Sequence, residues 1–141
     1  MMKNKVILDT SSLVALINKK DNYHEWVKLQ WEKINPPLLT CEPVITETCF
    51  LLQNVYGGQE IVMKFIEKKV IKIDFDLEQE ITKVKMLLQQ YQSVPMSLAD
   101  GCLVRMAELH NHSPIYTLDS DFRIYRKNRN QLIDLIIPED I

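Results

Sequence analysis

The chain has 141 residues, of which 46% are hydrophobic, so it has the size of one globular domain, 1–141, with a self-sufficient core. Its 17 basic and 19 acidic residues give a formal net charge of -2. This balance excludes the strongly basic field of many nucleic-acid-binding domains. Any nucleic-acid site must therefore be local.

The cysteines and the N-terminus indicate the compartment. Cys41, Cys49 and Cys102 share no CxxC spacing, so reduced, buried thiols are expected rather than a disulfide framework or a zinc knuckle. The apolar run that follows the charged N-terminus has only three residues, Val6-Ile7-Leu8. Because it is too short for a signal peptide or a membrane span, we expect a soluble cytoplasmic protein with no membrane partner.

Hydrophobic periodicity predicts that strands alternate with helices along the chain. The first half is expected to contain strands over 6–8 and 38–41, and helices over 13–17, 21–34, 43–56 and 59–69. In the second half we expect strands over 70–74, 115–118 and 132–137, and helices over 77–91 and 97–109. Short strands separated by helices are typical of a parallel sheet covered on both faces. The predicted fold class is therefore α/β, a three-layer α/β/α sandwich.

Ligands of such sheets bind beyond the carboxyl ends of the strands, and two acids follow predicted strands directly. Asp9 follows the apolar residues 6–8 and precedes three hydroxyl residues, so capping of the next helix is an alternative to catalysis. Asp119 follows the strand over 115–118, where a simple Asx turn is the alternative.

Two further acids fall in the first turns of predicted helices. Glu47 lies in a segment with few polar side chains, where a carboxylate is costly unless it is paired or binds a cation; its alternative role is to stabilise the helix dipole. Asp100 completes the sequence Ser97-Leu98-Ala99-Asp100, which matches a capping box. Its helical face also carries Leu103 and Val104, so it is expected to point toward the interior or into a cleft.

All four acids would converge on one edge of the sheet. Clustered carboxylates raise each other's pKa, so such a group makes physical sense chiefly around a divalent cation. Oxygen ligands without matched His or Cys favour Mg²⁺ or Mn²⁺ over zinc. The pattern therefore predicts metal-assisted hydrolysis, with phosphodiesters as the usual substrate class.

At this point the sequence resembles a known family. The segments 6–13, Thr46-Glu47, 97–103 and 117–122 are similar, in order and spacing, to the four acidic motifs of PIN-domain ribonucleases. The resemblance spans residues 6 to 122 and implies a five-stranded parallel sheet. It also implies Mg²⁺- or Mn²⁺-dependent endonucleolytic cleavage of single-stranded RNA, commonly by VapC-type toxins that a cognate antitoxin inhibits and that often form homodimers.

The resemblance also assigns roles to individual residues. It implies that the metal-binding and catalytic acids are Asp9, Glu47, Asp100 and Asp119. Asp121 would be an auxiliary metal ligand, and the open question is whether it or Asp119 is the main fourth acid. Ser11 and Thr117 would support the site by hydrogen bonds. Gly101, directly after the third acid, departs from expectation, since glycine loosens a helix by up to about 1 kcal/mol relative to alanine.

A basic cluster follows the fourth acid. Arg123, Arg126, Lys127 and Arg129, with Tyr125 among them, are predicted to hold RNA phosphates or stack a base, with a solvated turn as the alternative.

Three other functions compete with the metal-dependent nuclease. His110 and His112 could act as acid and base in a metal-independent ribonuclease, although they end a helix, where cationic residues are ordinary. A phosphatase of the haloacid-dehalogenase type also begins with a strand and an Asp, but it requires a second acid where this chain has Ser11. A PIN-like module that binds RNA or protein without cutting is the alternative from a different functional class.

Overall fold

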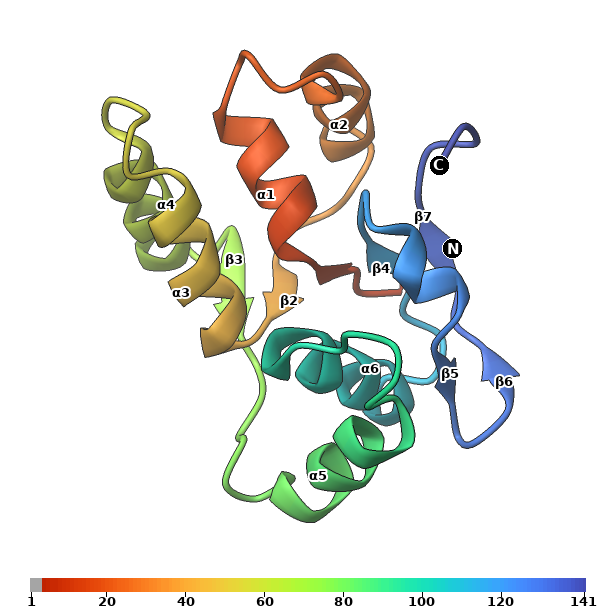
Figure 1. The fold of residues 1–141 in the computed structure, drawn as a ribbon. Helices are drawn as coiled ribbons and strands as arrows, with labels where there is room; N and C mark the ends of the chain where they lie inside the picture. Colours follow the sequence, from red (N-terminus) through yellow and green to blue (C-terminus); the bar gives the residue numbers. More distant parts are fainter. Residues whose placement is uncertain (1–3) are drawn as a thin grey trace.

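The computed structural model describes residues 4–141 and contains one five-stranded sheet (Figure 1). The first three residues of the predicted domain lie outside the described residues. The sheet order is β3-β2-β1-β4-β7, and every neighbouring pair is parallel. Its strands are β1 (Ile7–Leu8), β2 (Leu38–Thr40), β3 (Ile71–Ile73), β4 (Ile115–Tyr116) and β7 (Leu135–Ile136). The predicted five-stranded parallel sheet is confirmed.

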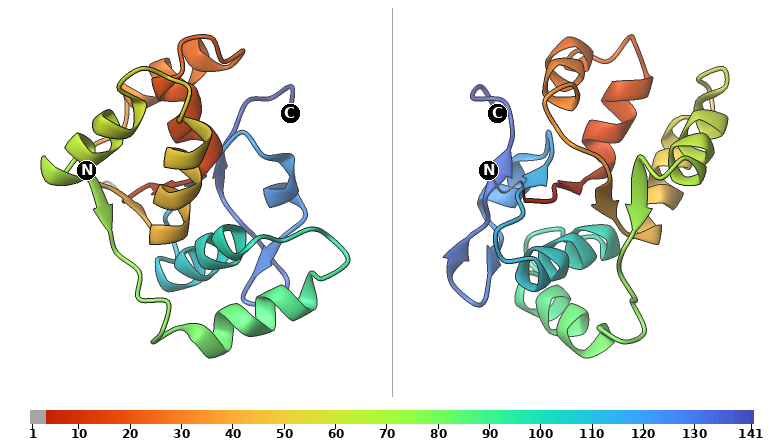
Figure 2. Two further views of the ribbon diagram at one scale, coloured as in Figure 1. Left: turned by 60° about the vertical axis from the view of Figure 1, so that its left-hand side comes forward. Right: turned by 180° about the vertical axis from the view of Figure 1, so that it is seen from behind.

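Within residues 4–141, six α-helices cover the two faces of the sheet (Figures 1 and 2). They are α1 (Thr10–Ile17), α2 (His24–Trp31), α3 (Glu42–Leu51), α4 (Gly58–Glu67), α5 (Ile81–Gln90) and α6 (Leu98–Leu109). Helices α1, α2 and α4 lie on one face and α5 and α6 on the other, while α3 contacts both α1 and α6. The predicted three-layer α/β/α sandwich is confirmed.

Two hydrophobic clusters, one on each face of the sheet, form the core. Successive strand residues point to opposite faces, so Ile7 belongs to the cluster under α5 and α6, and Leu8 to the cluster under α1 and α2. The same alternation places Ile115 in the first cluster and Tyr116 in the second. The central strands are therefore buried on both faces, which explains why they have no polar residue before their ends.

Several elements are shorter than predicted. Helix α3 ends at Leu51 rather than near Tyr56, and α5 begins at Ile81 rather than at Leu77, which lies in a preceding turn. Apolar spacing continued through both turns, so periodicity alone overestimated the helices. Between α3 and α4, Gly57 has a φ of +71°, a left-handed conformation that glycine adopts at no steric cost.

The C-terminal region contains an unpredicted hairpin. Strands β5 (Arg126–Lys127) and β6 (Gln131–Leu132) pair antiparallel beside the main sheet, after a short 3₁₀ helix, η1 (Ser120–Arg123). The strand predicted over 132–137 is therefore wrong at its beginning, because Leu132 pairs in the hairpin and only Leu135 and Ile136 join the main sheet.

Gly101 is a packing position between α6 and α5. A Cβ at this residue would lie 3.2 Å from Leu88 Cδ2 and 3.6 Å from Val84 Cγ1. Because Gly101 has no side chain, α5 can approach α6 closely. This packing explains the glycine in the first turns of α6 better than a loosening of the site does.

Candidate active site

Asp9 is a buried carboxylate at the carboxyl end of β1. Its Oδ1 accepts from Thr10 N (2.7 Å), so it caps α1, and its Oδ2 accepts from Ser11 Oγ (2.9 Å) and Thr117 Oγ1 (2.6 Å). Only 4% of the residue is exposed. Burial is the main reason that its pKa is raised to about 6, because desolvation disfavours the charged form. Asp9 therefore caps α1 and is also an acid with a raised pKa.

The two hydroxyls that hold Asp9 also join the ends of β1 and β4. Ser11 Oγ accepts from Leu118 N (2.9 Å), and Thr117 Oγ1 accepts from Asp119 N (2.9 Å). The backbone after β4, including the residue that bears the fourth acid, is thus fixed to the residues around Asp9. The site is built by two adjacent strand ends.

Glu47 reaches this region from α3 through a hydroxyl on α1. Thr10 Oγ1 donates to Glu47 Oε1 over 2.8 Å. The expectation of a costly position among apolar side chains is wrong, because Glu47 is exposed and its helical neighbours Phe50 and Leu51 are also exposed, by 65% and 56%. The contact with Thr10, rather than burial, fixes the position of this carboxylate.

Asp100 has two roles in the structure. It forms the predicted capping box, in which Asp100 N donates to Ser97 Oγ (3.1 Å) and Ser97 N donates to Asp100 Oδ2 (3.3 Å). The same Oδ2 accepts from the hydroxyl of Tyr125 (3.2 Å). Burial raises the pKa of Asp100, and the charge of Asp119 raises it further.

Asp119 and Asp121 lie on either side of the start of η1. Asp119 caps this turn, since its Oδ1 accepts from Asp121 N over 2.9 Å. Burial raises the pKa of Asp119, and the charge of Asp121 adds to the effect. Asp119 therefore forms the Asx turn that was the alternative to a catalytic role, and its carboxyl group also has a raised pKa.

Electrostatic repulsion connects Asp9, Asp100, Asp119 and Asp121, whereas Glu47 is connected to Asp9 through Thr10. The charge of Asp100 raises the pKa of Asp9, and the charge of Asp119 raises that of Asp100. We call Asp9, Glu47, Asp100, Asp119 and Asp121 the acidic site. Between residues 4 and 141, no three His, Cys, Asp or Glu side chains lie close enough to form a ready-made metal cage. The donor set, made only of carboxylates around the buried Asp9, still has the chemistry of a site for a hard divalent cation.

The basic cluster is arranged differently from the prediction. Lys127 is only 5% exposed and its Nζ donates to Asn111 O (2.6 Å), so its ammonium is held by the chain itself rather than free to contact a phosphate as predicted. Arg126 folds its Nη1 onto the backbone carbonyls of residues 123–125. Arg123 is exposed and bonds carbonyls of the C-terminal segment. Tyr125 is fully buried and cannot stack a base.

Sequence reasoning missed the site contacts of two residues, Tyr125, which it placed among RNA-binding residues, and Thr10, to which it gave no role. Tyr125 binds Asp100 and packs edge-on against Tyr91 and Phe122, and its basic neighbours made it look exposed. Thr10 binds Glu47, and the only signal for it was its place in a run of hydroxyl residues after Asp9.

The similarity of this chain to known proteins agrees with its fold. Residues 6–128 match the family model of the PIN domain. The structure is similar to the crystal structure of VapC20 from Mycobacterium tuberculosis, a Sarcin-Ricin loop cleaving toxin. The TM-score is 0.73 at 21% sequence identity, over 83% of this chain and 92% of that chain. No curated protein sequence gave a significant match. Because the family model spans most of the sequence, this chain belongs to the PIN domain family.

Proposed function

We propose that this protein is a Mg²⁺- or Mn²⁺-dependent endoribonuclease that hydrolyses phosphodiesters of single-stranded RNA. The observation that carries the proposal is the buried carboxylate Asp9, whose pKa is raised to about 6 and whose neighbours include Asp100. Such a group of like charges is stabilised by a divalent cation. Perturbed acids at the carboxyl edge of a parallel sheet are also where α/β folds place their chemistry.

In this proposal the residues of the chain bind and orient the reacting groups. A bound Mg²⁺ or Mn²⁺ supplies Lewis-acid activation of water and stabilises charge on the leaving oxygen. Asp9, Glu47, Asp100 and Asp119 would hold the cation, with Asp121 as an auxiliary. Ser11 and Thr117 fix the Asp9 carboxylate by the hydrogen bonds described above.

Two further hydrogen bonds orient Asp100 and Glu47. Tyr125 donates to Asp100 and Thr10 donates to Glu47, so both carboxylates are oriented before substrate binds. No protein nucleophile is required, and neither is the 2′-hydroxyl of the RNA. The expected products therefore carry a 5′-phosphate and a 3′-hydroxyl.

We further propose that the protein is a cytoplasmic toxin inhibited by a protein antitoxin and that it forms homodimers. The fold shared with the VapC20 toxin supports the first part. Exposed apolar side chains on and after α3 support a protein partner, with Phe50 65%, Leu51 56% and Tyr56 103% exposed. In residues 4–141, no helix is long and apolar enough to cross a membrane.

The test is cleavage of a labelled single-stranded RNA with and without Mn²⁺. We expect Mn²⁺-dependent cleavage that Asp9→Asn and Asp100→Asn abolish without loss of folding. Asp134→Asn, at an exposed carboxylate outside the acidic site, is the matched control and should remain active. Full activity in excess EDTA, or in either acidic-site variant, would contradict the proposal.

The second candidate is a PIN-like module that binds RNA or a protein without cutting. It is favoured by one observation, that no three acids of residues 4–141 form a ready-made metal cage. The same assay separates the two functions. A non-catalytic module would leave the RNA intact in Mn²⁺ and would bind equally well with Asp9→Asn.

A further inference from the structure

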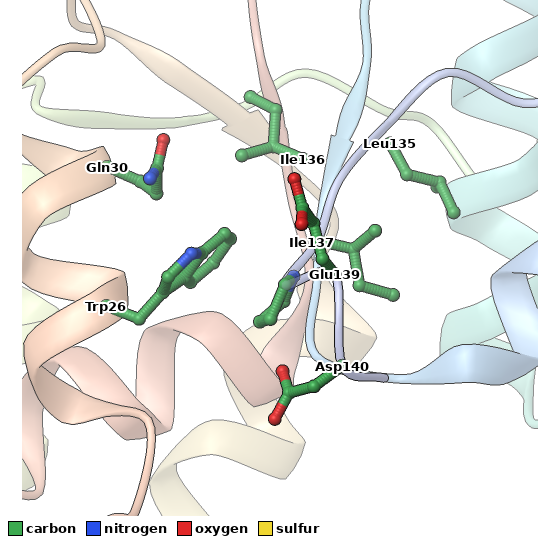
Figure 3. Close-up of a pocket in the computed structure, with 8 residues that line it drawn as sticks. Trp26, Gln30, Leu135, Ile136, Ile137, Glu139 and Asp140 are labelled. Atoms are coloured by element: carbon green, nitrogen blue, oxygen red, sulfur yellow. The ribbon is translucent and has the colours of Figure 1, made fainter.

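A pocket of about 610 Å³ lies between α2 and the segment that follows β7 (Figure 3). Trp26 and Gln30 project into it from α2, and Glu139 and Asp140 lie on the opposite side. Its volume falls within the range of roughly 300–1,000 Å³ of small-molecule sites. None of its lining residues belongs to the acidic site.

One wall of the pocket, residues 137–140, lies beyond the same sheet edge as the acidic site. Strand β7 runs parallel to β4, and β4 runs parallel to β1, so residues 137–141 leave the sheet where Asp9 and Asp119 do. Arg123, two residues after Asp121, donates from Nε to Ile141 O (3.1 Å) and from Nη2 to Pro138 O (3.5 Å). The segment that carries the fourth acid is therefore bonded directly to the pocket wall.

Trp26 is a fixed aromatic platform within this pocket. Its ring lies 6.3 Å from the buried ring of Tyr116, whose hydroxyl donates to Val27 O in the same helix. The indole is thus held between β4 and α2 while part of it lines the pocket. Stacking on an aromatic side chain is a usual way in which proteins bind an unpaired nucleobase.

The opposite side of the pocket offers hydrogen-bond acceptors. Glu139 and Asp140 are exposed carboxylates, and Asp140 Oδ2 already accepts from Tyr23 Oη (3.1 Å). Ionised carboxylates only accept hydrogen bonds, and they repel a phosphate. A base can enter such a pocket while its phosphate stays outside, near the guanidinium of Arg123.

We propose that this pocket binds a guanine base of the RNA substrate, stacked on Trp26 and hydrogen-bonded by a carboxylate of the 139–140 pair. The inference rests on the proposed ribonuclease function and adds a base preference to it. Guanine presents two adjacent donors, N1–H and N2–H, which match the two oxygens of a carboxylate. Uracil presents a single N–H between two carbonyl oxygens, which the carboxylate repels. Gln30 can donate its side-chain amide to guanine O6.

The test uses Trp26 as its own reporter. The chain has two tryptophans, so Trp31→Phe leaves only Trp26, and this variant is titrated with GMP, AMP, CMP and UMP in EDTA, where no cleavage occurs. We expect GMP to quench the fluorescence and to bind roughly 5- to 100-fold more tightly than UMP, the discrimination typical of a bidentate base contact. No quenching, or equal affinity for all four nucleotides, would overturn the proposal.

Calorimetric titrations of variants separate the contributions of the pocket. Trp26→Leu should weaken GMP binding by roughly 5- to 100-fold, the usual loss of one base stack, and Trp26→Phe should restore most of it. Glu139→Gln with Asp140→Asn should remove the preference for GMP. Glu25→Gln is the control, since Glu25 is an exposed acid on the same helix, with 82% of its side chain accessible.

A basic peptide and a cleavage assay complete the test of the pocket. If an oligoarginine peptide quenches Trp26 and GMP does not, the pocket binds basic protein side chains and the proposal is wrong. The titrations need neither metal nor cleavage, so a protein without nuclease activity could still show the base preference. Conversely, metal-dependent cleavage without a GMP preference would overturn this inference and leave the proposed function intact.

Discussion

Thr117 Oγ1 donates to Asp9 Oδ2 over 2.6 Å, and this contact joins residues 108 positions apart in the chain. The same oxygen accepts from Asp119 N. One hydroxyl therefore orients the buried acid at the end of β1 and fixes the backbone of the acid after β4. Thr117 is thus one of two side chains, with Ser11, that set the relative position of these two carboxylates.

Replacing this hydroxyl should weaken cation binding and activity. Thr117→Val keeps the shape of the side chain but removes both hydrogen bonds, and loss of such an orienting partner typically costs roughly 10- to 100-fold in metal affinity or activity. The measurements are the Mn²⁺ concentration for half-maximal RNA cleavage and the maximal rate. Thr117→Ser retains the hydroxyl and should behave like the wild type. Equal losses in both variants would assign the effect to packing instead.

The pKa of Asp9 predicts an unusual pH dependence of stability in the metal-free protein. Because burial raises this pKa from 3.8 to about 6, the folded state binds the proton more tightly than the unfolded state. The contribution of Asp9 to the free energy of unfolding is therefore largest below pH 4 and is lost as the pH rises through 6. At about 1.4 kcal/mol per pKa unit, the loss amounts to about 3 kcal/mol.

Urea unfolding at pH 4 to 8 in EDTA measures this loss. Asp9→Asn has no proton to release at this position, so its free energy of unfolding should lack the decrease. Mg²⁺ stabilises a protein when it binds only the folded state. At pH 7 it should stabilise the wild type more than Asp9→Asn, because the variant lacks one of the proposed carboxylate ligands. Parallel pH curves for the two proteins would show that Asp9 is not desolvated as described.

Tyr125 should tune the acidity of Asp100. Its hydroxyl donates to the carboxylate and so lowers the pKa of Asp100 against the larger effect of burial. In Tyr125→Phe, the acidic limb of the pH–rate profile is expected to move to higher pH while the fold is retained. Tyr91→Phe is the control, because Tyr91 packs against Tyr125 and its hydroxyl accepts from Arg126 N, a contact outside the acidic site. A shift of the same size in both variants would rule out a specific role of the Tyr125 hydroxyl.

Asp119 should matter more than Asp121 for metal-dependent cleavage. The charge of Asp119 raises the pKa of Asp100, whereas Asp121 acts on Asp119. Asp119→Asn keeps the oxygen that accepts from Asp121 N, so the turn should survive while metal-dependent cleavage is lost. Asp121→Asn should cost roughly 10- to 100-fold, as expected of a supporting partner. Side-by-side cleavage rates decide the assignment, and a larger loss in Asp121→Asn would reverse it.

The sequence was sufficient to predict the sheet because its central strands are buried on both faces. Ile7 and Leu8 point into opposite clusters, and so do Ile115 and Tyr116, so the strands read as short apolar runs that end at a polar residue. Asp9 and Asp119 were recognisable for the same reason. Ends of parallel strands share one edge of a sheet, so the position of these acids followed from the topology alone.

Residues whose surroundings depend on distant segments could not be predicted in this way. Tyr125 and Lys127 flank Arg126 in a basic segment, and nothing local shows that both side chains are buried where the hairpin begins. Phe50 is apolar yet 65% exposed, so composition misjudged the surroundings of Glu47. In each case the outcome was decided by tertiary contacts rather than by spacing.

Arg123 is an exposed member of the basic cluster and follows Asp121 of the acidic site by two residues, so it is placed to contact a phosphate. If it does so, Arg123→Gln should weaken binding of single-stranded RNA and reduce the slope of log affinity against log salt by about one. The slope changes because the wild-type contact neutralises one phosphate and releases its counterion, and the variant no longer releases this counterion. Arg129→Gln makes the same change of charge in the turn of the β5–β6 hairpin, where the arginine is exposed and has a φ of +78°. Filter binding at several salt concentrations measures both slopes. Equal slopes in the two variants would attribute the effect to overall charge, and an unchanged slope in Arg123→Gln would limit this residue to anchoring the C-terminal segment.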